Sequence, residues 1–264
     1  MIKRFADKHT LIFAILAVVV YQVILGVGLF AFQPFDLYTY NIITIASYFV
    51  PVVLIFFTIF ALKMKSDIGF TSKGFFKGVS LGWFFILVGI ISFVLGFDFS
   101  KLGSIESKTW AVLLPFTVTT LLVGITEEFL CRGIIVNIFL KKWNSPRMAV
   151  LVSSAIFGAA HITQFISAPG RPFGTAVSIV LGFAAGVLFA AVYLRSKNIW
   201  AVFFLHTIFD WLSNVPPVLL RPTVELTDIS LSGAIIEIVL AAAFFFIGMF
   251  LMRKRAKSNL NQDV

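Results

Sequence analysis

The chain alternates between long runs of apolar residues and short polar connections. Eight of the runs approach or exceed the roughly 20 helical residues needed to cross the hydrocarbon core of a bilayer. They cover residues 11–32, 41–62, 78–97, 110–140, 148–163, 176–194, 200–215 and 234–252. The pattern predicts an all-α membrane protein, a polytopic bundle of about eight transmembrane helices that forms a single domain over residues 1–264.

Two of these runs differ from the others. The fourth run is longer than a bilayer requires, so we expect this helix to tilt or to extend past the membrane. The seventh run stops at Pro216 and Pro217. Because proline lacks an amide donor and disfavours helix in the residue before it, we expect the helix to end at these prolines.

The composition agrees with a membrane location. Of the 264 residues, 59% are hydrophobic and 12% are charged, and the mean hydropathy is +1.01. Soluble domains are about 45–50% apolar and about 25% charged. The net charge of +9 does not indicate binding to nucleic acid, because the basic residues form short clusters between apolar runs. The single cysteine, Cys131, has no partner for an internal disulfide and is expected to pack in the core.

The basic clusters alternate between the two sides of the predicted membrane. With the amino terminus in the cytoplasm, 16 of the 21 Lys and Arg residues fall on the cytoplasmic side and 4 on the other, and Arg132 lies inside a helix. The cytoplasmic set is Lys3, Arg4, Lys8, Lys63, Lys65, Lys73, Lys77, Lys141, Lys142, Arg147, Arg195, Lys197, Arg253, Lys254, Arg255 and Lys257. The opposite set is Lys101, Lys108, Arg171 and Arg221. By the positive-inside rule, this alternation predicts eight spans with both termini cytoplasmic.

A few ionisable side chains interrupt the apolar runs. They are Glu127, Glu128, Arg132, His161, His206, Asp210 and Glu237. A charge at the centre of a bilayer costs about 2.5–3.5 kcal/mol on insertion scales, so we expect these groups to be paired and used. Counted at about 1.5 Å per residue from the cytoplasmic helix ends, Glu127 and His161 lie roughly 20 Å deep and His206 roughly 9 Å deep. These depths permit one shared layer.

Helical spacing assigns these groups to faces. Residues four apart share a face, so Glu128 is predicted to pair with Arg132, and His206 to neighbour Asp210. Glu127 points about 100° away from Glu128. It therefore has no partner on its own helix, which makes it a candidate general base.

Less specific interpretations of the same residues stay open. A membrane histidine can serve only as a hydrogen-bonding group between helices, a Glu–Arg pair can be purely structural, and Asp210 can be a cap. Glu237, alone on the last run, is expected to be structural. Phe157 and His161 share a face of a run rich in small residues, which lets helices approach closely. The joint occurrence of three clusters on three runs favours a common site.

In order along the chain, the three clusters resemble the signature of the CPBP intramembrane proteases. This family, also called Abi, groups CAAX prenyl-protein endopeptidases with bacteriocin-processing and immunity proteins. Its motifs are Glu-Glu-x-x-x-Arg, Phe-x-x-x-His and His-x-x-x-Asn/Asp. They are matched by Glu127, Glu128 and Arg132, by Phe157 and His161, and by His206 and Asp210. The resemblance covers residues 120–214. It implies eight helices around a cavity open to the cytoplasm, with residues 111–215 as the catalytic core helices.

The resemblance also implies an enzyme that cleaves a peptide bond within or beside the membrane. By analogy, Glu127 and His161 would activate water, His206 and Asp210 would hold the oxyanion or a metal, and Arg132 would fix Glu128. Two chemistries stay open. In one, Glu127 acts as the base without a metal. In the other, zinc is a cofactor bound by His161, His206 and a carboxylate.

We therefore expect an intramembrane endopeptidase, integral to a bacterial plasma membrane, that acts on a membrane-associated peptide or protein at the lipid bilayer and binds no nucleic acid. Asp210 stands where Asn is common among the prenyl-protein proteases, which favours a bacterial branch. A proton-coupled transporter is one alternative, although the sequence shows no inverted repeat of the kind many carriers have. A non-catalytic immunity or peptide-binding membrane protein is the other.

Overall fold

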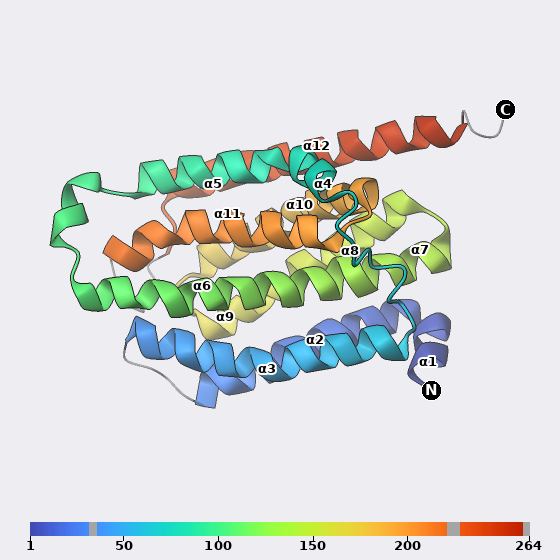
Figure 1. Ribbon diagram of the computed structural model, residues 1–264, viewed down its shortest axis with the longest axis horizontal. Coiled ribbons are helices and arrows are strands. Elements are labelled where there is room, and N and C mark those ends of the chain that lie inside the picture. Colours follow the sequence, from blue (N-terminus) through green and yellow to red (C-terminus); the bar gives the residue numbers. More distant parts are fainter. Residues whose placement is uncertain (32–35, 221–227, 261–264) are drawn as a thin grey trace.

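The computed structural model describes residues 1–31, 36–220 and 228–260, with side chains up to residue 27, from 36 to 220 and from 228 to 253. Within these ranges every regular element is a helix. The long helices run side by side along one axis (Figure 1). The prediction of a polytopic α-helical bundle is confirmed.

The helices pack in layers around a buried centre. The first are α1 (Ile2–Lys8), α2 (Thr10–Ala31), α3 (Leu37–Ala61), α4 (Phe75–Leu81), α5 (Trp83–Gly96) and η1 (Phe99–Ser104). The middle of the chain forms α6 (Ser107–Glu128), η2 (Phe129–Val136), α7 (Asn137–Trp143), α8 (Pro146–Ala160), η3 (His161–Thr163) and α9 (Gln164–Ser167). Then follow α10 (Pro172–Ser196), α11 (Ile199–Leu220) and α12 (Leu231–Leu260). In Figure 1, α2 and α3 form one outer layer and α5 and α12 the opposite one.

Helix α10 is the centre of the bundle. It packs against both α8 and α12. Of the candidate membrane-spanning stretch in α10, 72% is buried inside the protein, whereas the buried share of the other candidate spans is 22–33%. Helix α11 packs against α5 and α6. The three helices that carry the sequence motifs, α6, α8 and α11, are therefore interior or adjacent to the interior.

The count of eight spans stays a prediction. Among the described residues, six helices are long and apolar enough to cross a membrane, and a seventh results if α4 and α5, which are bent by 59°, form one span. Helix α11 corresponds to the seventh predicted run but is not among the six. Its polar residues His206, Asp210 and Asn214 lower its hydropathy.

The expected end of the seventh run is wrong. Helix α11 continues through Pro216 and Pro217 to Leu220. Two prolines remove two amide donors from the last turns, but the residues around them are packed: Val215 and Leu219 are buried together with Phe97. We infer that this apolar packing outweighs the lost hydrogen bonds.

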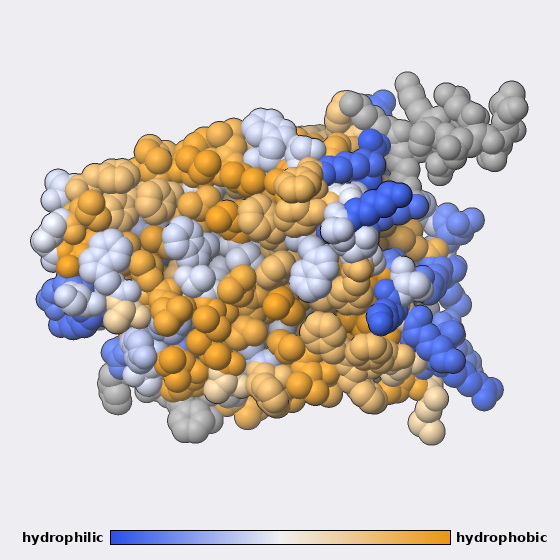
Figure 2. Space-filling view, in the orientation of Figure 1, coloured by the Kyte–Doolittle hydropathy of each residue, from blue (hydrophilic) through white to orange (hydrophobic). Residues whose placement is uncertain are grey.

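The surface of the molecule is divided along its long axis. Apolar side chains cover the flanks, and hydrophilic side chains lie at both ends, with the larger number at the end where α1 and α7 lie (Figures 1 and 2). The start of α1 and the end of α12 lie at the same end of the bundle. That this end is cytoplasmic stays a prediction.

Candidate active site

The fourth predicted run is one continuous helical stretch of 37 residues, Ser107–Trp143, and its centre is a π-helix. All eight residues of this π-helix, η2, are buried. Such segments are rare and occur often at functional sites. The Asn137 amide donates to the carbonyl oxygens of Arg132 (3.2 Å) and Gly133 (2.8 Å) and to the Tyr193 hydroxyl (2.7 Å). Asn137 therefore supports backbone groups in the wider turn.

Glu128 and Arg132 form a buried ion pair at the start of this segment. The distance from Arg132 Nη1 to Glu128 Oε1 is 2.8 Å, and the two side chains are 2% and 0% exposed. The guanidinium lies over the Phe157 ring, 4.4 Å from its centroid, and Nη2 donates to the Gly186 carbonyl oxygen at 3.4 Å. The pairing predicted from the spacing is present, and Phe157 of the second motif covers the arginine.

Glu128 Oε1 also binds His206, which joins the first motif to the third. The distance to His206 Nδ1 is 2.7 Å, and the imidazole stacks on Phe189 with centroids 5.0 Å apart. A carboxylate carries no hydrogen, so His206 Nδ1 is the donor in this bond. The contacts of Glu128 with Arg132 and His206 are both made by Oε1. The other oxygen, Oε2, is buried and has no hydrogen-bond partner in the described part of the chain.

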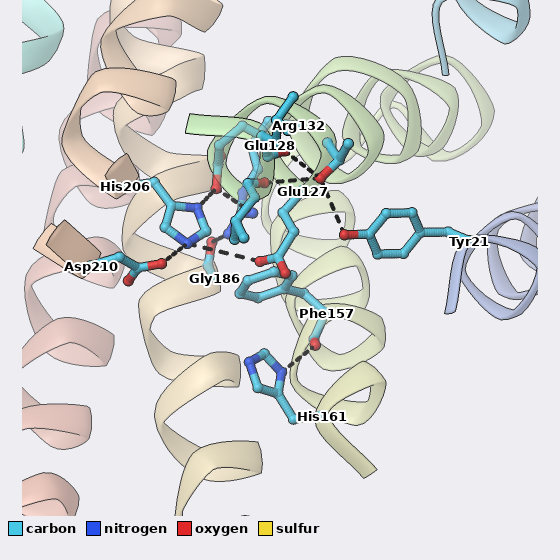
Figure 3. Close-up of polar contacts among 12 residues, drawn as sticks. Tyr21, Glu127, Glu128, Arg132, Phe157, His161, Gly186, His206 and Asp210 are labelled. Carbon is cyan, nitrogen blue, oxygen red and sulfur yellow. Dashed lines mark hydrogen bonds and ion pairs between the residues drawn. The ribbon is translucent and has the colours of Figure 1, made fainter. Parts of the chain in front are cut away.

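The other ring nitrogen of His206 faces two carboxylates. Nε2 lies 3.3 Å from Asp210 Oδ2 and 3.8 Å from Glu127 Oε2. Unlike Glu128, these carboxylates are partly exposed, Glu127 by 22% and Asp210 by 30%. Figure 3 shows the resulting order of the groups, with Glu128 and Arg132 behind the ring and Glu127 and Asp210 beside Nε2.

His161 lies apart from this network. It begins η3, and in the described part of the chain its ring makes one hydrogen bond, from Nδ1 to the Phe157 carbonyl oxygen at 3.1 Å. Figure 3 shows the Phe157 side chain between His161 and the other motif residues. Glu127 interacts electrostatically with His161 as well as with His206. Of the six predicted site residues, five thus form one contact network and His161 stands at its edge.

The placement of the donors bears on the zinc alternative. No group of three or more His, Cys, Asp or Glu side chains in the described residues is arranged to hold a metal ion. His161 and His206, the two tentative ligands, do not converge on a common point with a carboxylate. The side chains of the described residues, as placed, therefore do not fit a tetrahedral zinc site.

Two consecutive residues of α2 hold the site from outside the motifs. The Tyr21 hydroxyl lies 3.1 Å from Thr126 Oγ1, and the Gln22 amide donates to the Ala160 carbonyl oxygen at 3.0 Å. Thr126 and Ala160 directly precede Glu127 and His161. Neither Tyr21 nor Gln22 was predicted from the sequence to be part of the site. The only signal for them was a Tyr-Gln pair inside an otherwise apolar run.

Comparisons with known proteins give one match. Residues 109–212 match a family model described as type II CAAX prenyl endopeptidase Rce1-like. The matched stretch begins in α6, ends in α11 and includes all three motifs. No curated protein and no solved structure matches the chain.

Proposed function

Over residues 109–212 the chain belongs to the CPBP family of CAAX-type intramembrane proteases, and from this premise we propose that it hydrolyses a peptide bond in a membrane-associated peptide or protein, with Glu127 as the general base. The family and the apolar helices indicate a protease that is integral to a membrane and acts on a peptide substrate. We assign the following roles to individual residues as part of this proposal.

The observation that carries this assignment is the difference between two adjacent glutamates. Glu128 is fully buried and its Oε1 accepts from both Arg132 and His206. Glu127 is partly exposed, and its closest ionic contact, with His206, is 3.8 Å long. A general base must reach the water whose proton it takes. Of the two adjacent glutamates, only Glu127 combines exposure with an oxygen that is free to accept that proton.

The reaction follows from these positions. Glu127 takes a proton from water as the water oxygen bonds to the carbonyl carbon of the scissile peptide, which gives a tetrahedral oxyanion. Glu127 then gives the proton to the leaving nitrogen, and the C–N bond breaks. One water is consumed, an acid and an amine are formed, and the carboxylate is regenerated.

His206 is placed to stabilise the oxyanion. Its Nδ1 proton is held by Glu128, so a proton on Nε2 makes the ring a cation that can donate to a negatively charged oxygen. Asp210 Oδ2 lies 3.3 Å from Nε2 and accepts a hydrogen bond from the protonated nitrogen before substrate binds. This assigns Asp210 the role of orienting His206.

His161 is suited to orient the attacking water. Its Nδ1 faces a carbonyl oxygen, which can only accept, so Nδ1 carries the ring proton. Nε2 of the neutral ring then has a free lone pair that can accept a hydrogen bond from water. Arg132 acts indirectly. It donates a hydrogen bond to Glu128, and Glu128 accepts a hydrogen bond from His206.

The test compares two intramembrane glutamates. The full chain is placed in liposomes with a panel of membrane peptides, and cleavage is followed by mass spectrometry. Because general acid–base catalysis contributes about 10²–10⁴-fold, Glu127→Gln is expected to lose at least about 100-fold in turnover. Glu237→Gln, in α12 and outside the contact network, is the matched control and is expected to keep it. Wild-type turnover in Glu127→Gln would overturn the proposal.

A further inference from the structure

A cavity lies at the hydrophilic end of the bundle. Its volume is about 310 Å³, and it is enclosed by α1, the start of α2, the end of α3 and α7. The lining residues are Lys3, Ala6, Asp7, Thr10, Leu62, Met64, Ile138, Lys141 and Lys142. None of them belongs to the network around Glu127. Ile138, the lining residue nearest to Glu127 along the helix, is roughly 15 Å further on.

The polar part of the cavity is positively charged. Three lysines and one aspartate line it, and with the Asp67 carboxylate beside Lys141 the formal charge is +1. Lys141 is paired with Asp67, which is not a lining residue. Lys142 Nζ makes one long hydrogen bond, 3.4 Å, to the Asp7 carbonyl oxygen, and in the described residues Lys3 has no ion pair. Since an ammonium group has three donors, Lys3 and Lys142 retain donors for an anion.

The apolar part of the cavity points to a lipid as the source of that anion. Four of the lining residues are apolar and buried, namely Ala6, Leu62, Met64 and Ile138. Two further apolar residues of α1, Ile2 and Phe5, are each 40% exposed. The cavity lies at the start of α2 and just after the end of α3, two of the apolar candidate membrane spans. At this level of a membrane protein the surrounding anions are phospholipid headgroups.

We propose that this cavity binds the phosphate headgroup of an anionic phospholipid, with Lys3 and Lys142 as its ligands. The lipid would dock α1 against α7 and the end of α3, while its acyl chains continue along the apolar flank. The site is independent of the proposed peptidase reaction, so either proposal can fail without the other.

The test is a lipid titration of the purified full chain in a neutral detergent, read by the unfolding temperature. Short-chain phosphatidylglycerol is expected to raise this temperature saturably, and less so at high salt, because salt screens exposed charges. Phosphatidylcholine of the same chain length and inorganic phosphate are expected to have no such effect. The latter arm separates a lipid headgroup from free phosphate.

Two double variants locate the effect. Each lysine near an anionic headgroup contributes roughly a fivefold factor in affinity, so Lys3→Gln/Lys142→Gln is expected to bind about 25-fold more weakly. Lys73→Gln/Lys77→Gln removes the same charge from exposed positions outside the cavity and should bind normally. An equal loss in both double variants, or an equal shift with phosphate or phosphatidylcholine, would overturn the proposal.

Discussion

Two ion pairs on the same continuous helix have the same length and opposite surroundings. Lys108 and Glu106, at the start of α6, are 2.8 Å apart, with side chains 81% and 66% exposed. Arg132 and Glu128, in the middle, are also 2.8 Å apart but 2% and 0% exposed. Water can replace either partner of the first pair, whereas loss of one partner of the second leaves a charge buried. Burial, and not distance, decides what such a pair does.

The strongest way to break this comparison is to remove one cation from each pair. Arg132→Ala leaves Glu128 buried with His206 as its sole partner and is expected to cost about 3–5 kcal/mol, a fall in unfolding temperature on the order of 10 °C. Lys108→Ala should leave the unfolding temperature unchanged. The two variants are compared in the same detergent. Equal effects would show that burial does not separate these pairs.

His161 is expected to affect the turnover rate and not the stability of the protein. His161 is partly exposed, and in the described residues its ring makes one hydrogen bond, to a backbone carbonyl. His161→Gln should therefore leave the unfolding temperature unchanged and reduce the turnover rate roughly 100-fold through loss of water positioning. His9→Gln, at the junction of α1 and α2, serves as control. Unchanged turnover in His161→Gln would remove this residue from the mechanism.

The contacts from α2 should have a smaller effect. Tyr21→Phe deletes the hydrogen bond to Thr126 beside Glu127, and one such bond contributes about 1 kcal/mol, or roughly fivefold in rate. We expect kcat to fall by about this factor while KM stays the same, because the substrate-binding surface is intact. Tyr38→Phe, on the exposed face of α3, is the control. A change confined to KM would contradict a positioning role.

The smallest effect is expected at the far end of α10. The Asp228 carboxylate accepts from the backbone amides of Phe173 and Gly174. Desolvation opposes the charged form of Asp228, but these bonds and Arg171 outweigh it and lower the pKa of the carboxyl. A lowered pKa contributes stability above the unfolded value of about 3.9 that is lost as the pH falls through the folded value. Asp228→Asn should therefore flatten the acid limb of the unfolding-temperature profile, and an unchanged limb would contradict this.

The sequence predicted most of the helices and the pairs within them, because both depend on local periodicity. Glu128 meets Arg132, and His206 meets Asp210, as a spacing of four residues requires. The contact from Glu128 to His206 could not be predicted, since it depends on how α11 is rotated against the π-helix. Nor does periodicity reveal the π-helix itself, because it arises from a change in backbone hydrogen-bond register.

Other features required tertiary contacts. Tyr21 and Gln22 bind residues more than 100 positions away, and nothing in their own run indicates which helix they face. Counting residues from the helix ends places His161 at the same depth in the membrane as Glu127. The depth of a residue does not determine the direction in which its side chain points around the helix. At Pro216, local preference was overridden by packing against α5.

The central claim is that Glu127 and Glu128, adjacent and chemically identical, have different tasks. The most direct test measures unfolding temperature and peptide cleavage for Glu127→Ala and Glu128→Ala side by side. We predict that Glu127→Ala keeps the unfolding temperature of the wild type and loses cleavage. We predict that Glu128→Ala lowers the unfolding temperature, as Arg132→Ala does, and loses cleavage as a consequence. Equal destabilisation by the two variants, or cleavage that survives Glu127→Ala, would contradict it.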